Sequence, residues 1–153
     1  MLIQQLNRTD PEKVQITVKN TETTSITNGM AVALCIGTSG SFDGIQCVKA
    51  ASGSTANLPG FLGVAVQDIA SQGFGLVQMF GPVASVMLSN VGTSITIAAG
   101  DPLIPSPGLG LFSSGVPTYA ASGFGWVIAS NVPANTLSVA APLYCSGFVR
   151  GLI

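Results

Sequence analysis

Short apolar segments separated by turn residues make up most of the chain. Residues 14–19 (VQITVK) alternate polar and apolar side chains, and Asn28-Gly29 interrupts a largely apolar stretch at 25–36. Such patterns, rich in Val and Ile, are typical of β-strands. The further predicted strands are 45–50, 61–69, 73–81, 83–89, 93–98, 101–105, 123–129 and 136–149. No segment follows the helical period, so the sequence predicts an all-β fold, a β-sandwich or β-barrel (jelly-roll-like) of short antiparallel strands.

Charged residues are rare and concentrated at the start of the chain. Only 7% of the residues are charged, and the first 22 positions hold six of them, Arg8, Asp10, Glu12, Lys13, Lys19 and Glu22. We therefore divide the chain into an N-terminal arm or edge segment, residues 1–22, and a β-sandwich or barrel domain, residues 23–153. The first segment is either an arm that lies on a partner or an ordinary solvated first strand, and the sequence leaves both open.

Two pairs of segments resemble each other within the chain. TSITNGMAVAL (24–34) is similar to TSITIAAGDPLI (93–104), because each has the same four residues, then a glycine, then an apolar strand. About 30 residues later, GVAVQDIASQGFGLVQM (63–79) and GWVIASNVPANTLSVAA (125–141) each suggest a strand, a small polar turn and a strand. Two such halves would suit a duplicated β-domain.

The charge balance argues against nucleic-acid and membrane partners. The net charge is -1 and no basic cluster is present, whereas phosphate neutralisation supplies most of the affinity of nucleic-acid binders. The fully apolar runs, such as 31–36, are far shorter than a membrane-spanning helix. The first residues lack the basic-then-apolar pattern of a signal peptide.

The residue types needed for catalysis are mostly missing. The chain has no histidine, which removes imidazole bases, histidine-containing triads and most zinc sites. Asp43, Asp68 and Asp101 lie in separate turns, where aspartate usually caps the backbone. The three cysteines, Cys35, Cys47 and Cys145, form no metal-binding spacing, and we interpret them as small buried residues in a reduced compartment. We predict no catalytic residue, no cofactor, no metal and no enzymatic activity.

So few charges point to a protein that is covered by neighbours. Charged side chains are the residues least often buried and are depleted in interface cores. One standard interface covers about 800 Å² per partner, so a surface this poor in charge suits a subunit with several contacts. As candidate interaction residues we take the charged residues of the N-terminal segment with three aromatic residues and the last arginine: Arg8, Asp10, Glu12, Lys13, Phe74, Phe80, Trp126 and Arg150.

The sequence also resembles small bacteriophage head decoration, or capsid cement, proteins. The resemblance covers roughly residues 25–104 and includes ITNGMAVAL, GVAVQDIASQGFGLVQMFGPV and ITIAAGDPLI. It is carried by small residues at set spacings, namely Gly63, Ala65, Ile69, Ala70, Gly73, Gly75, Val77 and Gly81. The family implies an all-β module that binds the outside of the capsid shell and clamps neighbouring major capsid subunits. It further implies self-association as a trimer or dimer, synthesis in the host cytoplasm, and a place on the exterior of the virion.

Three other functions remain open at this point. The chain could be another homo-oligomeric phage structural protein, such as a tail, fibre or minor head component. It could be a carbohydrate-binding β-module, for which Tyr119, Trp126 and Asn131 are suitable residue types. An enzyme that uses Asp68 is the third alternative.

Overall fold

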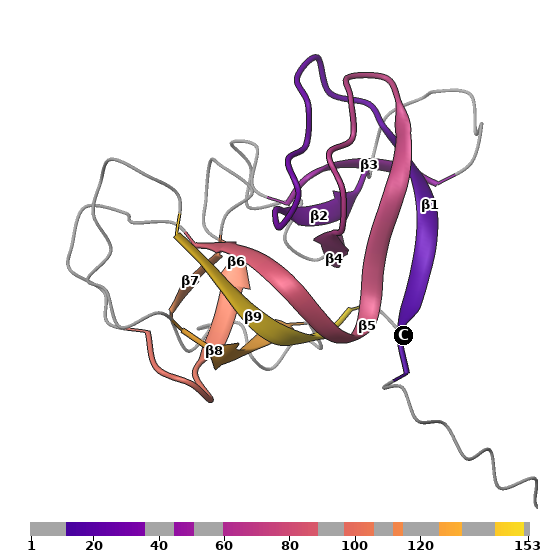
Figure 1. Ribbon diagram of the computed structural model, residues 1–153. Coiled ribbons are helices and arrows are strands. Elements are labelled where there is room, and N and C mark those ends of the chain that lie inside the picture. Colours follow the sequence, from indigo (N-terminus) through magenta and orange to yellow (C-terminus); the bar gives the residue numbers. More distant parts are fainter. Residues whose placement is uncertain are drawn as a thin grey trace, which may run out of the picture.

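The computed structural model describes residues 12–35, 45–50, 60–88, 97–105, 112–114, 126–132 and 143–151. These residues form nine β-strands in one continuous sheet (Figure 1). The strands are β1 (Val14–Asn20), β2 (Ala31–Leu34), β3 (Gln46–Lys49), β4 (Phe61–Ala65), β5 (Phe74–Leu88), β6 (Pro102–Pro105), β7 (Phe112–Ser114), β8 (Trp126–Asn131) and β9 (Leu143–Arg150). The predicted all-β fold is confirmed.

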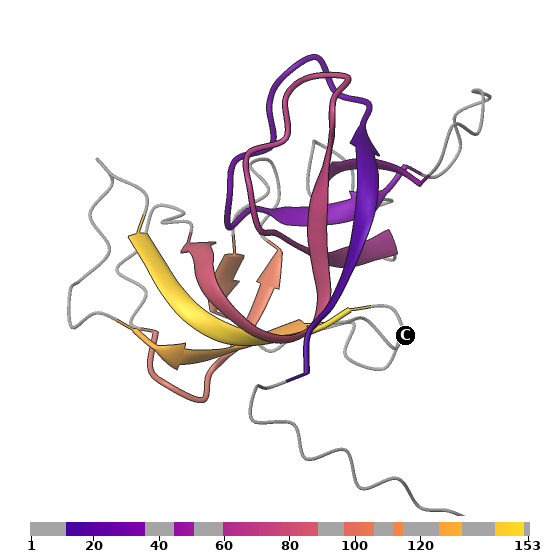
Figure 2. The same ribbon diagram turned by 45° about the vertical axis from the view of Figure 1, so that its right-hand side comes forward.

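The sheet closes into two rings that share one strand. The first ring is β1-β3-β2-β4-β5, closed by pairing of β1 with β5, and the second is β5-β7-β6-β8-β9, closed by pairing of β5 with β9. Figures 1 and 2 show the two barrels side by side, with β5 passing from one to the other. Two pairings, β1–β3 and β5–β7, are parallel, which the expectation of antiparallel strands did not include.

The N-terminal segment contributes a strand to the first barrel. β1 pairs with β3 on one side and with β5 on the other, so residues 14–20 have a neighbouring strand on each side. Residues 1–11 lie outside the described residues. No helix in the described part of the chain is long and apolar enough to cross a membrane.

β5 is a single bent strand where the sequence predicted two, at 73–81 and 83–89. Its first half pairs with β1, from Lys19 opposite Phe74 to Val14 opposite Phe80. Its second half pairs with β9, from Phe80 opposite Arg150 to Leu88 opposite Leu143. Gly81, at a φ of 99°, lies where one half meets the other. Gly81-Pro82 resembles a turn, but here the positive φ redirects the strand without reversing it.

The two barrels repeat the same turn and the same register. Gly29 and Gly100 both have positive φ, 87° and 95°. Gly29 N–H donates to the Ala65 carbonyl at 2.8 Å, and Gly100 N–H donates to the Ala129 carbonyl at 2.8 Å. The amides of Ala65 and Ala129 in turn donate to the carbonyls of Met30 and Asp101, at 3.0 Å each. The strands after the turns, β2 and β6, pair equivalently with β4 and β8. The described part of the repeat predicted from 24–34 and 93–104 is thus present in the fold, whereas residues 93–96 lie outside the described residues. In the second predicted pair, 63–79 and 125–141, the match is offset by two residues, because Ala65 corresponds to Ala129 and not to Val127.

The buried apolar residues form two clusters. One lies within the first barrel and is built around Val18, Ile26, Val32, Ile69 and Val77. The other combines second-barrel residues such as Leu103 and Val127 with residues of the first barrel, Ala31 and Ala33 of β2 and Phe61 and Val64 of β4. Strands β2 and β4 of the first barrel therefore contribute side chains to both clusters.

The cysteines are thiols and no disulfide joins them. Cys47 and Cys145 are buried, as predicted, whereas Cys35 is half-buried. Burial raises the pKa of Cys47 to about 12, with smaller contributions from Glu22 and Cys35. Burial also raises the pKa of Cys145 to about 11. Both groups therefore stay neutral in the folded protein at neutral pH.

These thiols predict a loss of stability in alkali. An unfolded thiol titrates near pH 9, so above that pH the unfolded chain releases protons that the folded chain keeps. The free energy of unfolding should be unaffected by these groups below pH 9. It should fall between pH 9 and about 12, by at most about 1.4 kcal/mol per pH unit for each thiol. Denaturant titrations at several pH values measure this, and Cys47→Ala should show a shallower decline than the parent. If the free energy of unfolding fell equally steeply with pH in both proteins, the raised pKa of Cys47 would be contradicted.

The bend of β5 predicts a second difference in stability. A Cβ at Gly81 would overlap the carbonyl oxygen of Glu12, whereas a Cβ at Gly100 would have no atom within 4 Å. Both glycines have positive φ, so alanine at either position incurs a backbone strain of about 1 kcal/mol. Gly81→Ala should therefore lower the free energy of unfolding by about 3 kcal/mol, and Gly100→Ala by about 1 kcal/mol. Equal losses in urea titrations would show that Glu12 does not pack against the bend.

Candidate interaction site

The outer surface near the bend of β5 carries a set of neighbouring apolar side chains. Val14 of β1 lies opposite Phe80 of β5, and Phe80 lies opposite Arg150 of β9. In the next row, Phe148 of β9 lies between two partners, Pro82 of β5 and Ile128 of β8. Directly opposed residues in antiparallel strands point to the same side of the sheet. We call this surface the four-strand face and define it as Val14, Phe80, Pro82, Ile128, Phe148 and Arg150.

The four-strand face is exposed to an unusual degree for its residue types. Val14, Ile128 and Phe148 keep 38%, 42% and 41% of their surface exposed. The rings of Phe80 and Phe148 contact edge to face, with centroids 5.1 Å apart and planes at 85°. Neighbouring exposed apolar side chains of this kind mark sites of interaction more often than scattered single ones do. We therefore take the four-strand face as the candidate site.

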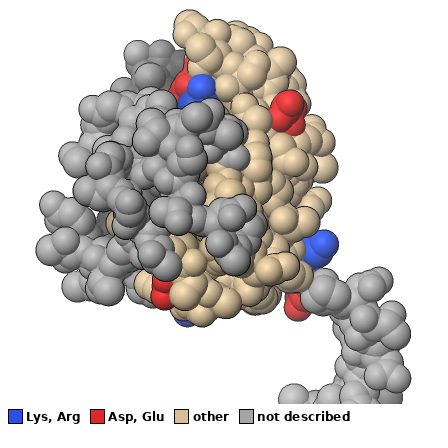
Figure 3. Space-filling model, turned by 60° about the vertical axis from the view of Figure 1, so that its left-hand side comes forward, with Lys and Arg blue, Asp and Glu red and all other residues tan. Residues whose placement is uncertain are grey.

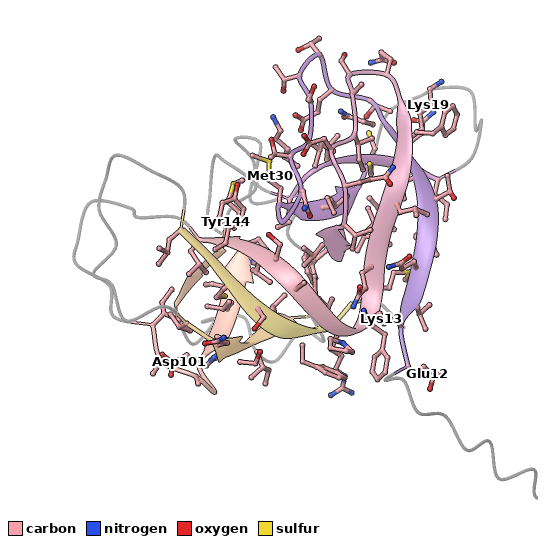
Figure 4. All side chains as sticks on the ribbon, viewed as in Figure 1. Glu12, Lys13, Lys19, Met30, Asp101 and Tyr144 are labelled. Atoms are coloured by element: carbon pink, nitrogen blue, oxygen red, sulfur yellow. The ribbon has the colours of Figure 1, made fainter. Side chains whose placement is uncertain are left out.

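Several of the residues predicted from the sequence meet here. Phe80, Trp126 and Arg150 occupy one row, because Arg150 lies opposite both of the others. The backbone of Glu12 and Lys13 lies against Gly81, beside Phe80. Figure 4 shows the labelled Glu12 and Lys13 at the same end of the molecule as the bend of β5. Arg8 and Asp10 lie outside the described residues.

Phe74 is not part of this site. It begins β5 at the far end from the bend and keeps 60% of its surface exposed. Its ring lies below the ammonium group of Lys19, 5.8 Å from Nζ to the ring centroid. The structure therefore separates Phe74 from the other predicted aromatic residues.

The internal repeat gives Phe74 a counterpart, Tyr144, in the second barrel. Lys19 lies opposite Phe74 in the first barrel, and Met87 lies opposite Tyr144 at the equivalent position in the second. Tyr144 keeps 40% of its surface exposed. Figure 4 shows Tyr144 well separated from Lys19, the neighbour of Phe74. Each barrel thus exposes one aromatic ring at the same place in its strand order.

Sequence reasoning missed Val14, Ile128, Phe148 and Tyr144 as surface residues. In β9 the burial alternates: Tyr144, Phe148 and Arg150 are exposed, whereas Cys145, Gly147 and Val149 are buried. The clue was Arg150, because a charged residue at an alternating position identifies the outer side of its strand.

The described aspartates serve as turn caps. Asn28 N–H donates to Oδ1 of Asp68 at 2.7 Å, and Ala98 N–H donates to Oδ2 of Asp101 at 2.8 Å. Asp101 thus caps its own turn, as predicted, whereas Asp68 caps the Asn28-Gly29 turn, 40 positions away in the sequence. Asp43 lies outside the described residues. On the face seen in Figure 3, charged side chains occupy a small part of the described surface. Among the residues that the structure describes, no group of three or more His, Cys, Asp or Glu is placed to hold a metal ion.

Comparisons with known proteins add a likeness in fold. No protein-family model and no curated protein sequence matches the chain. The crystal structure of the N base of head fiber gp8.5 in bacteriophage phi29 is similar, with a TM-score of 0.51 and 16% sequence identity. The match covers 91% of this chain and 95% of that chain, so the likeness extends over both barrels. This chain therefore has the fold of a known head-fiber base.

Proposed function

We propose that this chain is a structural protein of a phage virion that binds the outer surface of the head and cements neighbouring major capsid subunits. The observation that carries the proposal is the fold, which matches the base of a phage head fiber over 91% of the chain. The low charge of the sequence supports it, because only 7% of the residues are ionised and several broad contacts would cover such a surface.

The repeated aromatic residues favour a cementing contact over a single attachment point. Phe74 and Tyr144 occupy equivalent positions in two barrels of the same strand order. Exposed aromatic side chains are the residue type that anchors protein interfaces most often. Two equivalent anchors on one rigid sheet suit two copies of one repeating partner, as neighbouring capsid subunits are. The partner in this proposal is thus the major capsid protein.

A fibre base is the second candidate, and the fold of the phi29 protein favours it directly. A cement protein and a fibre base differ in what they do to the shell. The cement bridges subunits and raises the temperature at which shells break, whereas a fibre base attached at one point leaves that temperature unchanged. Both would place the protein on the capsid exterior.

The described cations are poorly placed for nucleic acid. Lys19 lies over the Phe74 ring, and Lys49 pairs with Glu22 at 3.7 Å. Lys13 and Arg150 lie near the bend of β5, whereas Lys19 lies at the other end of β1. We accordingly propose neither a nucleic-acid nor a membrane partner. Because Asp68 is engaged by the Asn28 amide, we also propose no catalytic role for it.

Binding to phage heads tests the proposal. The purified protein should co-sediment with heads that lack it and should raise their melting temperature. Because the proposed contact is apolar, binding should change less than about threefold between 0.1 and 0.5 M salt. Phe74→Ser and Tyr144→Ser should each weaken binding by about tenfold, and the double variant should reduce it further.

Thr23→Ala, a change at an exposed residue outside β1, β5 and β9, provides the matched control and should bind like the parent. Binding without a change in head melting would favour the fibre base over the cement. No binding to heads, together with saturable binding to a glycan array, would instead support a carbohydrate-binding module.

A further inference from the structure

The Asn28-Gly29 turn is bonded to both barrels through the backbone of Gly29, which is buried. The N–H of Gly29 donates to the Ala65 carbonyl of β4 at 2.8 Å. The carbonyl of Gly29 accepts from the N–H of Met87, in the half of β5 that belongs to the second barrel, at 2.9 Å. The turn therefore joins a strand of the first barrel to a strand of the second.

Asn28-Gly29 is also the one place in the sequence where glycine follows asparagine. Asparagine is chemically labile, most of all before glycine, which has no side chain to shield its backbone nitrogen. The Gly29 nitrogen loses its proton to hydroxide and forms a bond with Cγ of Asn28. The bond from Cγ to Nδ2 breaks, and Nδ2 takes a proton from water and leaves as ammonia. Water then opens the cyclic imide at either carbonyl, which gives aspartate or isoaspartate.

We propose that Asn28 is a modification site, at which the folded chain delays conversion to aspartate and isoaspartate. The reaction requires loss of the Gly29 proton, but this proton is buried in the bond to Ala65. It also requires the Gly29 nitrogen to turn toward Cγ of Asn28, which the bond from Met87 opposes. Oδ1 of Asp68 restrains the other side of the turn, because it accepts from the Asn28 amide at 2.7 Å. Conversion therefore proceeds only when the turn opens locally.

The second barrel has the same turn without the reactive residue. Gly100 corresponds to Gly29 in its positive φ and in its hydrogen bonds. Ala99 precedes Gly100 where Asn28 precedes Gly29, and Asp101 caps this second turn. The turn therefore forms without a carboxamide at this position, and Asn28→Ala should fold.

Conversion should loosen the connection between the barrels. Isoaspartate routes the backbone through the side chain, which adds a carbon atom between Cα of residue 28 and the Gly29 nitrogen. The bonds of Gly29 to Ala65 and Met87 then lose their geometry. Aspartate keeps the backbone unchanged but adds a carboxylate to the residue whose amide binds Asp68, so like charges repel. The inference does not rest on the proposed function, because it concerns a reaction of the isolated chain with water.

Mass spectrometry of the tryptic peptide 20–49 measures the reaction, because conversion raises the mass of the peptide and fragmentation locates the change. The purified full chain is incubated at mildly alkaline pH, both folded and in guanidinium chloride. Two backbone hydrogen bonds hold Gly29, so the folded chain should react about thirtyfold more slowly than the unfolded chain, or slower still. Equal rates in the two states would overturn the inference.

The two turn caps provide a variant and its matched control. Asp68→Ala should raise the rate in the folded chain about fivefold or more and leave the rate in denaturant unchanged. Asp68→Asn, which keeps a neutral acceptor, should react at a rate between those of the parent and Asp68→Ala. Asp101→Ala removes the corresponding cap in the second barrel and should leave the rate at Asn28 unchanged. An equal acceleration in Asp101→Ala and Asp68→Ala would contradict local control by this turn.

The product itself provides the last measurement. Asn28→Ala should abolish the mass increase in this peptide, and an increase that persists in this variant would assign the reaction to another residue. The converted chain, separated from the parent by its added negative charge, should unfold at a lower denaturant concentration. Equal unfolding midpoints would show that the turn does not connect the barrels as proposed.

Discussion

The bend of β5 at Gly81 is the constraint on which the rest of the structure depends. A straight strand could join only one of the two barrels, because β1 and β9 pair with different halves of β5. Gly81 adopts a φ of 99° at this point, with the Glu12 backbone packed where a side chain would be. The absence of a Cβ therefore provides both the bend and the space for the N-terminal segment. The four-strand face exists because strands from both barrels meet at that bend.

Several of the charged side chains that the structure describes hold backbone segments in place. The Lys49 amide donates to Oε1 of Glu22 at 2.8 Å, and this contact joins the end of β1 to β3. Asp68 and Asp101 each hold a turn. Buried Asn20 connects segments that are distant in the sequence, since its Nδ2 donates to the carbonyls of Thr24, Ile69 and Ala70. Polarity in this chain is used mainly to order turns, which leaves most of the strand surface for neutral contacts.

The sequence predicted features that depend on neighbouring residues and missed those that depend on pairing across the fold. Local chemistry accounts for strand 14–19, the Asn28-Gly29 turn and the Asp101 cap, and the repeat follows from comparing two segments. The partner of Asp68 could not be predicted, because Asn28 lies 40 positions away in the sequence. The sequence analysis divided β5 into two strands at Gly81-Pro82, because these residue types are typical of turns. The sequence alone does not distinguish a turn between two strands from a bend within one strand. Strand β7 and the parallel pairings were missed because they are determined by distant partners. For the candidate site, Phe80, Trp126 and Arg150 were chosen by residue type, and only the register shows that they share a row.

The four-strand face also explains why two similar barrels do not make two similar sites. Phe74 and Tyr144 are equivalent because each lies within one barrel, at the same step of the repeat. The four-strand face has no counterpart among the described residues, because it needs β1 from the first barrel and β8 and β9 from the second. The strand they share, β5, occurs once in the chain. A surface at the junction of two repeats can therefore have a function that neither repeat has alone. Its residues cannot be recognised by comparing the two halves of the sequence. In this chain, that surface places the exposed Phe148 beside Phe80 and in the row next to Arg150.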